Sequence, residues 1–359
     1  MLYYEKKVKE ILSIFLKYEN GEISLEELEE FKVRTKNENI KFGLTIEPDD
    51  NYNFLLYEKY WILLINILNN KIDKKSLNQI INFIKAEEFI EKIKCEEKDF
   101  DVEFVKKINK PLIYIDNNIY ISMKKSINLE DLNDDIQFVY SPAHLEELAN
   151  SIRNNNFEYN EYIDKDLKFL SDLTNNFEFL PSENDGIVLC KELPKYPLKR
   201  VIKYYEGTIL SEKLEKEFLE KRELIRKELA LKLTTKDIKG VLKSQEGKKL
   251  LEKKEWYKEY ESIGDKTIFW EKYKNDYNFL FNSINGIVEI LEILDNSPES
   301  SRKYRSHLHD TSHIIYATQS DIFVTNDRRL SDKMTEIVDF LGLQTKILDY
   351  KTFIEIYFS

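Results

Sequence analysis

Four carboxylates stand where a parallel sheet would bring acidic side chains together. Asp116 ends a short apolar run, and Asp327 follows another such run by two residues. Glu147 lies on the segment that follows an intervening apolar run, and Asp310 precedes the run that leads to Asp327. Acids gathered at one place repel one another strongly unless cations sit among them. Because oxygen ligands of this kind suit Mg²⁺ or Mn²⁺, the residues predict a site for one of these metals.

The chemistry that such a site would support is hydrolysis of a phosphodiester. Two bound cations about 4 Å apart can activate a water molecule and stabilise the leaving oxygen. We therefore predict that the four acids are both the catalytic groups and the metal ligands of a nuclease. Each acid alone has an ordinary explanation, because Asp is common in turns and at helix starts and Glu often lies on a wet helix face. Their joint occurrence is what favours a site.

Two apolar runs support the first half of the predicted site. Residues 112–115 and 138–140 are short and rich in β-branched and aromatic side chains, as expected of buried parallel strands. The second run ends at Ser141 and Pro142, which can cap a helix and occupy its first position. A helix is therefore predicted from residue 143 to about 154, with the glutamate of the site on it.

Helices and strands alternate again after residue 306. We predict helix, strand, helix, strand and helix over residues 310–319, 321–325, 330–340, 345–348 and 350–356. Strands and helices joined by short links are typical of an α/β fold, here three layers with a central parallel sheet. Sites in such sheets form at the carboxyl ends of the strands, where the predicted acids lie.

The rest of the chain is predicted to be helical. Residues 1–105 favour an accessory helical region, with amphipathic spacing over residues 4–18 and a capping box at residues 24–27. Residues 106–359 would form the α/β domain. Its core would span about 110–156 and 306–357, with a helical insert at about 157–305. Further helices are expected over residues 57–68, 75–94, 210–232, 247–261 and 277–294.

Composition narrows the class of protein. The net charge of -11 argues against a general coat on DNA, because phosphate binding depends on Lys and Arg. It is compatible with a nuclease, since a carboxylate-rich pocket is acidic until cations bind. The two cysteines, Cys95 and Cys190, form no disulfide framework and are expected to be small core residues. The sequence carries no signal-peptide pattern and no apolar run of roughly 18 residues, which predicts a cytoplasmic protein without a membrane span.

Four motifs carry a family resemblance. In chain order they are Tyr114-Ile115-Asp116-Asn117-Asn118, Leu145-Glu146-Glu147-Leu148, Asp310-Thr311-Ser312-His313 and Phe323-Val324-Thr325-Asn326-Asp327. Together they resemble the motifs of PIN-domain ribonucleases. The resemblance covers about 110–156 and 306–357. The long separation between the second and third motifs departs from compact members of that family.

The resemblance implies a role for each matched residue. Glu147 is the best match to the family's helix glutamate, and Glu146 is the alternative in the adjacent register. Supporting roles are expected for four polar residues: Asn118, Ser141, Thr325 and Asn326. Asn117 stands where the family usually has Thr or Ser, which would change the hydrogen bonding beside the metal.

The implied activity is that of a metal-dependent endonuclease that uses Mg²⁺ or Mn²⁺ and cleaves RNA in preference to DNA. Proteins of this family are often toxins, as in toxin-antitoxin pairs, or antiviral defence effectors that a protein partner holds silent. A regulatory protein partner and a homo-oligomer are both compatible with that implication.

Two other functions compete with this prediction. One is a PIN-like scaffold that binds RNA or a protein without cutting. The other is an HD-type phosphohydrolase in which His309 and Asp310 hold a metal, but that scheme needs an upstream histidine and only His144 is present. A zinc site at these histidines is disfavoured because no cysteine lies near them. The basic and aromatic stretch at 248–258 could hold single-stranded nucleic acid, although a solvated helix face explains it more simply.

Overall fold

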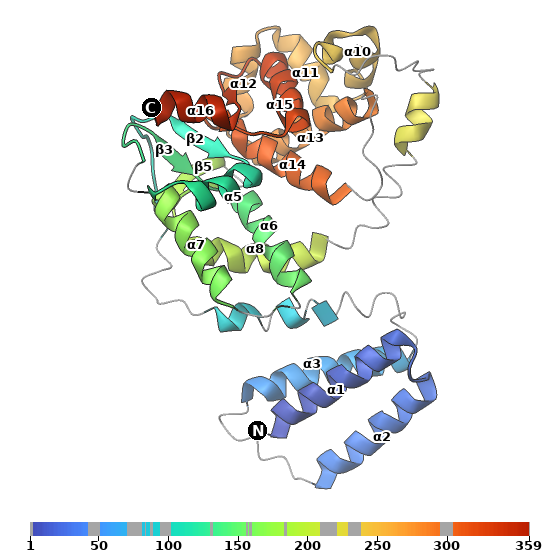
Figure 1. Cartoon of the computed structure of the whole chain (residues 1–359). Coiled ribbons are helices and arrows are strands. Elements are labelled where there is room, and N and C mark those ends of the chain that lie inside the picture. Colours follow the sequence, from blue (N-terminus) through green and yellow to red (C-terminus); the bar gives the residue numbers. More distant parts are fainter. Residues whose placement is uncertain are drawn as a thin grey trace. The chain divides into compact units, whose positions relative to one another are not determined.

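The computed structural model divides the chain into two compact units, Met1–Lys92 and Ile93–Ser359, and each is described by itself. The boundary lies earlier than the expected position near residue 105. The structure describes residues 3–41, 51–69, 81–82, 84–86, 89–93, 102–129, 132–155, 157, 160–182, 185–208, 221–228, 238–294 and 304–358. Figure 1 draws these residues as ribbon.

The first unit is helical, as predicted. Its described helices are α1 (Tyr3–Asn20), α2 (Leu25–Lys41) and α3 (Asn51–Leu68). The capping box before α2 is present, because Ser24 N donates to Glu27 Oε2 at 2.7 Å and Glu27 N donates to Ser24 Oγ at 3.2 Å. Most of the helix predicted at 75–94 lies outside the described residues, although those described between 81 and 92 are helical.

The second unit is a mixed α/β structure built on a four-stranded parallel sheet. Its strands are β2 (Leu112–Ile115), β3 (Gln137–Val139), β6 (Ile322–Val324) and β7 (Lys346–Leu348). They lie in the order β3-β2-β6-β7, so the two central strands come from the two distant halves of the sequence. Ile115 pairs with Val324, which places the carboxyl ends of β2 and β6 side by side. The predicted parallel strands are confirmed.

Helices pack on both faces of this sheet. The helices that flank it are α5 (Asn117–Ser126), α6 (Pro142–Asn154), α7 (Glu161–Thr174), α13 (Tyr277–Leu294), α14 (Tyr304–Ala317), α15 (Arg328–Leu341) and α16 (Tyr350–Tyr357). A further helix, α8 (Lys195–Thr208), packs against α6. Tyr114 and Phe323 face a core made with α13, α14 and α15. Phe138 points the other way and meets Phe353 of α16 at a ring distance of 6.0 Å. The alternation of side chains along each strand therefore supplies both cores.

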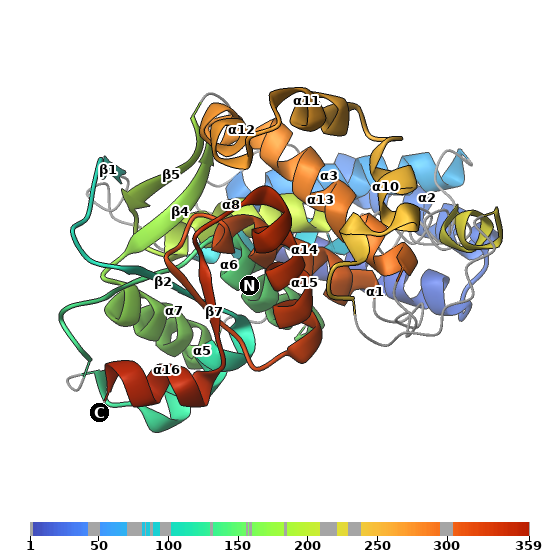
Figure 2. The ribbon, with the colours of Figure 1, turned by 90° about the horizontal axis from the view of Figure 1, so that it is seen from above.

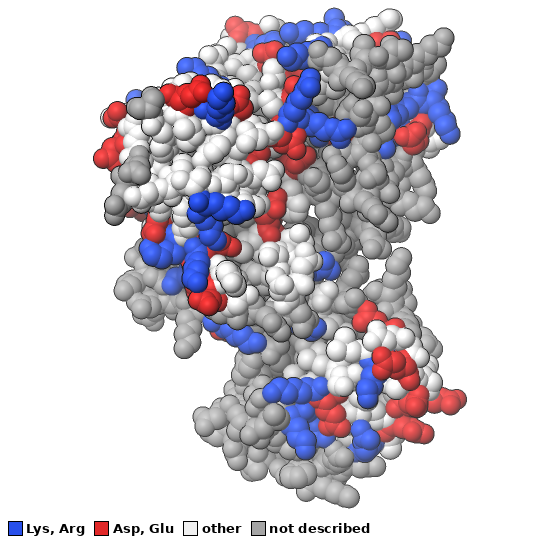
Figure 3. Space-filling model, viewed as in Figure 1, with Lys and Arg blue, Asp and Glu red and all other residues white. Residues whose placement is uncertain are grey.

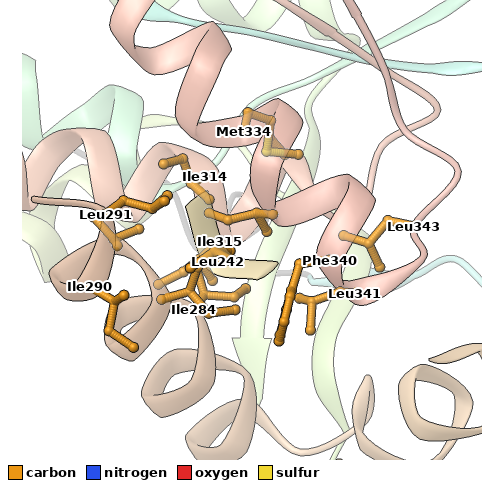
Figure 4. Packing of buried hydrophobic residues seen from close by; sticks show 14 of the residues in the cluster. Leu242, Ile284, Ile290, Leu291, Ile314, Ile315, Met334, Phe340, Leu341 and Leu343 are labelled. Atoms are coloured by element: carbon orange, nitrogen blue, oxygen red, sulfur yellow. The ribbon is translucent and has the colours of Figure 1, made fainter. Parts of the chain in front are cut away.

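The larger core is formed mainly by helices. Figure 4 shows Ile284 and Leu291 of α13 packed with Ile314 of α14 and with Met334 and Phe340 of α15. Burying a side chain of this size contributes roughly 1.5 to 3 kcal/mol. This cluster explains why the predicted helix at 277–294 forms, because its apolar face is covered along most of its length.

The expectation of an all-helical insert is wrong, because the second unit contains an antiparallel sheet. Its strands are β1 (Glu103–Phe104), β4 (Phe177–Ser182) and β5 (Gly186–Lys191), in the order β1-β5-β4. β4 and β5 run side by side in Figure 2. The two strands are rich in aromatic and β-branched residues, which favour a pleated surface. Pairing of β1 with β5 also assigns residues 103–104 to this unit.

Other parts of the insert are helical. Besides α7, α8 and α13, they comprise the short 3-10 turn η5 (Val241–Lys243) and the helices α10 (Gln245–Leu251), α11 (Glu255–Ile263) and α12 (Lys266–Tyr273). The helix predicted at 247–261 is thus interrupted between Leu251 and Glu255. Of the helix predicted at 210–232, only residues 221–228 are described, and they are helical. Within the described part of the chain, no helix has the length and hydropathy needed to cross a membrane.

One boundary changes the surroundings of a predicted site residue. Asp310 was expected to open a helix, but α14 begins at Tyr304 and Asp310 lies within it. The preceding residues contain no proline or glycine that would stop a helix from extending backwards. The helix-start explanation of Asp310 therefore does not apply.

Candidate active site

Asp116 lies at the junction of β2 and α5 and is buried. It caps α5, with Oδ1 accepting from Ile119 N at 2.9 Å, and Oδ2 accepts from the Thr325 hydroxyl. Burial raises the pKa of Asp116 most strongly, and the charge of Asp327 raises it further. Hydrogen bonds from Thr325 and from the main chain oppose that increase. The carboxylate is therefore fixed in place but costly to ionise.

Thr325 connects the ends of the two central strands. Its hydroxyl donates to Asp116 and accepts from Asp327 N at 3.0 Å. Asp327 caps α15 through Oδ1, which accepts from Arg329 N at 2.8 Å and from Leu330 N at 3.1 Å. The strand register explains this arrangement, because the pairing of Ile115 with Val324 makes Asp116 and Thr325 neighbours. Thr325 thus lies between Asp116 and Asp327 and is hydrogen-bonded to both.

Glu147 is half-buried on α6 and is held from α5. Its Oε2 accepts from Asn117 Nδ2 at 3.0 Å. Burial is the main cause that raises the pKa of Glu147, and the charges of Asp116 and Glu146 add to it, whereas His309 and Asn117 act in the opposite direction. Glu147 therefore lies within electrostatic reach of Asp116.

Asn117, which departs from the family pattern, is the asparagine that contacts an acid of the site. Asn118 contributes instead through its main chain. Its N–H donates to Asp116, and its carbonyl accepts from Ser122 Oγ at 2.8 Å. The supporting role expected for the Asn118 side chain is thus replaced by a contact of the neighbouring residue.

Glu146 takes a different partner. Its Oε2 lies 3.2 Å from His309 Nδ1. Burial lowers the pKa of His309, but the hydrogen bond to Glu146 and the charges of Glu146, Glu147 and Asp310 outweigh that effect and raise it. The ion pair therefore joins α6 to α14 beside the predicted glutamate.

Asp310 faces a lysine. Its Oδ2 lies 3.9 Å from Lys333 Nζ, and the same ammonium group lies 2.6 Å from Glu292 Oε1. The side chains of Lys333 and Glu292 are each only 5% exposed, which leaves little water to screen the three charges. Asp310 thus belongs to an ionic cluster of α13, α14 and α15, and its charge also raises the pKa of His309.

A buried hydrogen-bond network lies beneath the acids. The Tyr114 hydroxyl lies 2.7 Å from Ser141 Oγ and 2.9 Å from His313 Nδ1. His144 donates from Nε2 to Ile115 O at 2.8 Å and accepts at Nδ1 from Ser141 N at 3.2 Å. Burial lowers the pKa of His144 to about 4, so its ring is neutral. Ser141 therefore supports the network under the site and caps α6.

Asn326 also has a structural partner. Its Oδ1 accepts from Tyr350 N at 3.0 Å and so fixes the start of α16.

The network under the acids was not predicted, because Tyr114 resembles any other apolar strand residue in the sequence. The short apolar segment before Asp116 was the only available signal for it.

The geometry gives no support to the HD-type alternative. That scheme needs His144 as an upstream metal ligand, but both of its ring nitrogens are already hydrogen-bonded to main-chain atoms. The stretch at 248–258 does not present its aromatic residues to a ligand either, since Trp256 and Tyr257 are buried against Phe340.

The spacing of the four acids is wider than that of a closed metal cage. In the described residues, only Glu178, Cys190 and Glu192 bring three possible ligand atoms within 4.8 Å of one another. Asp116, Glu147, Asp310 and Asp327 do not form such a group. The charge of Asp327 nevertheless raises the pKa of Asp116, and the charge of Asp116 raises the pKa of Glu147.

A cavity of about 600 Å³ adjoins the site between α5, α6 and α7. Asn117 and Glu147 line it together with Lys124, Lys125 and polar residues of α6. In Figure 3, acidic atoms gather in a strip over the middle of the second unit, and lysine and arginine atoms lie on both sides of it.

Comparison with family models, curated proteins and solved structures found no match for this chain.

Proposed function

We propose that the chain is a metal-dependent endonuclease with a three-layer, PIN-like domain, and that it cleaves RNA. The observation that carries the proposal is the placement of Asp116 at the carboxyl end of a central parallel strand. There it is tied to Thr325 and lies within electrostatic reach of Asp327 and Glu147. In open α/β sheets this edge is where ligand sites form.

The donor set fits a hard divalent cation. Asp116, Asp327 and Glu147 offer only oxygen ligands, and burial of two of them disfavours their charged forms until a cation is present. Mg²⁺ usually keeps several water ligands and binds one or two carboxylates directly, so acids spaced more widely than 4.8 Å are compatible with it. When bound, the metal would supply an activated water and charge stabilisation at the phosphate.

The protein's own groups would hold and orient the reacting centre. Thr325 fixes Asp116, and Asn117 fixes Glu147, so that neither acid has to be ordered during the reaction. His309, whose pKa is raised, would present positive charge near a phosphate oxygen. Asp310 would complete the acidic set through its link to His309 and Lys333.

The neighbouring cavity supports a nucleic-acid substrate. Lys125 can contact a phosphate, whereas Lys124 already pairs with Asp166 of the same cavity wall, and the amide side chains along α6 can hydrogen-bond to sugars or bases. Single-stranded RNA fits this surface better than a duplex, because bases of a single strand can enter a cavity of about 600 Å³.

The test compares cleavage by the wild type and by two aspartate variants of α15. Asp327→Asn should lower Mn²⁺-dependent cleavage of single-stranded RNA by on the order of 10²-fold or more. Asp332→Asn is the matched control, because Asp332 lies on the same helix and pairs with Arg328 at 3.8 Å, outside the acidic set. It should retain wild-type cleavage.

Structured RNA and single-stranded DNA provide the other arms of the assay. Equal cleavage by the wild type and Asp327→Asn would refute the assignment of the site. Binding of RNA by the wild type without cleavage of any substrate would favour the scaffold function instead.

A further inference from the structure

A second cluster of metal-ligand side chains lies in the antiparallel sheet. Glu178 of β4 pairs directly with Cys190 of β5, and Glu192 follows Cys190 by two residues, so the three side chains share one face. Their donor atoms all lie within 4.8 Å of one another. Glu178 and Cys190 are fully buried and Glu192 is 3% exposed. None of the three belongs to the acids of the proposed nuclease site.

One carboxylate oxygen in this cluster has no partner. The Tyr140 hydroxyl lies 3.2 Å from Glu178 Oε2, but its single hydrogen has a nearer acceptor in Glu192 O at 2.7 Å, and Glu178 Oε1 is buried and has no hydrogen-bond partner. A buried oxygen without a partner costs about 1 to 3 kcal/mol, and more when it is charged. Such a group calls for an explanation. Burial and the neighbouring Glu192 raise the pKa of Glu178, so this carboxyl keeps a proton until a cation takes its place.

A guanidinium group orients the other glutamate. Arg200 of α8 donates from Nη1 and Nη2 to the two oxygens of Glu192, each at 2.7 Å. Each oxygen retains a lone pair, so this bidentate contact leaves Glu192 able to bind a metal. Partners of this kind commonly fix the carboxylate ligands of metal sites.

We propose that Glu178, Cys190 and Glu192 form a binding site for Zn²⁺ in which they supply three of its four ligands. A sulfur ligand beside two carboxylates suits this borderline cation and disfavours Mg²⁺ or Ca²⁺. The ion and the Arg200 guanidinium together balance the charges of two carboxylates and a thiolate. Zinc ligand bonds of about 2.0 to 2.3 Å place donor atoms roughly 3.5 Å apart, so side-chain shifts of about an ångström close the site.

The bound ion would fasten the antiparallel sheet to the parallel sheet. Tyr140 follows β3 directly and forms a parallel bridge with Glu178, and its hydroxyl donates to Glu192 O at 2.7 Å. Ordering β4 and β5 at this point would therefore also order the start of α6, which carries Glu147. The inference stands whether or not the chain is a nuclease.

The experiment measures zinc bound by the full chain after treatment with a chelator and addition of Zn²⁺. The wild type should bind one tightly held ion per chain and unfold at a higher temperature with zinc than without it. Cys190→Ala and Glu178→Gln should lose that ion and that increase. Cys95→Ala and Asp327→Asn are the controls, and both should keep them.

Cobalt provides a readout that does not depend on folding of the Cys190 variant. The chain has two cysteines, so Cys190 is the only thiol left in Cys95→Ala. Co²⁺ added to that variant should give the intense near-ultraviolet absorption of a thiolate-bound ion, and Zn²⁺ should abolish it. Absence of this band, or zinc binding that Asp327→Asn removes, would overturn the proposal.

Discussion

At the scale of single residues, the candidate site depends on acids that the fold makes costly to ionise. Asp116 and Glu147 are buried enough for desolvation to raise both of their pKa values, and the charge of Asp327 raises that of Asp116 further, as the charge of Asp116 does that of Glu147. Hydrogen bonds from Thr325 and Asn117 offset part of that cost. Perturbed carboxyls with dedicated hydrogen-bond donors are typical of functional sites, because a purely structural acid gains nothing from repulsion.

The two adjacent glutamates of α6 can be distinguished by their partners. Glu147→Gln should lower Mn²⁺-dependent cleavage by on the order of 10²-fold, because it removes a charge beside Asp116. Glu146→Gln should have a smaller effect on cleavage and should lower the pKa of His309, which NMR titration measures. A larger loss of cleavage from Glu146→Gln would transfer the catalytic role to the adjacent register.

The neutral histidine under the site predicts acid sensitivity. Burial lowers the folded-state pKa of His144 to about 4, against about 6.5 in an unfolded chain. Below pH 6.5 the unfolded chain therefore binds a proton that the folded chain does not. The contribution of His144 to the free energy of unfolding is therefore fully present above pH 6.5. It falls by about 3 kcal/mol as the pH approaches 4.

His144→Gln should therefore reduce the fall in unfolding free energy between pH 6.5 and pH 4, measured by urea titration. His313, whose pKa burial also lowers, would account for the remaining slope. His309→Gln is the opposite control. The folded-state pKa of His309 is raised, so its protonation stabilises the folded chain at low pH. Its removal should therefore make the fall in unfolding free energy with decreasing pH steeper. An unchanged slope in His144→Gln would contradict the prediction.

Residue types at strand ends could be predicted from the sequence, whereas their partners could not. Asp116 and Thr325 were recognisable because each follows an apolar run that reads as a strand. Asn117 as the partner of Glu147 depends on how α5 packs on α6, and the Lys333 contact with Asp310 depends on how α14 packs on α15. Contacts between elements carry no local sequence signal, which is why these were missed.

At the scale of elements, the antiparallel sheet is the main departure from prediction. β5 begins at Gly186, whose φ of 73° lies in the left-handed region that favours glycine. Periodicity predicted α13 correctly because its apolar face is long and regular. A hairpin with mixed burial on both strands lacks the strict alternation that would reveal it.

The hairpin should be sensitive to a side chain at Gly186. An added Cβ there would lie 2.8 Å from Asn275 Cα and would also contact the Lys274 carbonyl oxygen. Gly264 has a similar φ of 68° but open space around it. Gly264→Ala should therefore cost about 1 to 2 kcal/mol of unfolding free energy from the backbone alone.

Gly186→Ala should cost the same backbone free energy as Gly264→Ala. It should cost roughly 1 to 3 kcal/mol more because the added Cβ overlaps with residues 274–275. Urea unfolding followed by tryptophan fluorescence compares the two variants. Equal losses would mean that the loop at residues 274–275 moves aside, and the close approach would then carry no cost.

At the scale of the whole molecule, the parallel sheet joins two distant halves of the sequence. Its central strands, β2 and β6, are separated by about two hundred residues, and residues of α10, α11, α12 and α13 from the intervening chain pack into the same core as these strands. The order of the predicted strands was accessible from the sequence, but the packing of the insert was not, because its charged helices bury only part of their surface.

The division of the chain predicts independent folding of residues 93–359. The cores of the two units are formed by separate sets of residues, with Phe15, Tyr60 and Leu64 in the first and Ile284 and Ile314 in the second. A unit with its own core can fold alone. The fragment 93–359 should therefore unfold cooperatively, and it should retain the Mn²⁺-dependent cleavage that we propose for the full chain.

Calorimetry of the full chain and the fragment provides the measurement. The full chain should show two transitions, one of which coincides in temperature with the single transition of the fragment. A single transition for the full chain, together with an unfolded fragment, would mean that the first unit is needed to complete the second. A folded fragment that lacks cleavage seen in the full chain would instead assign the helices of the first unit to substrate binding, because the four acids would all still be present.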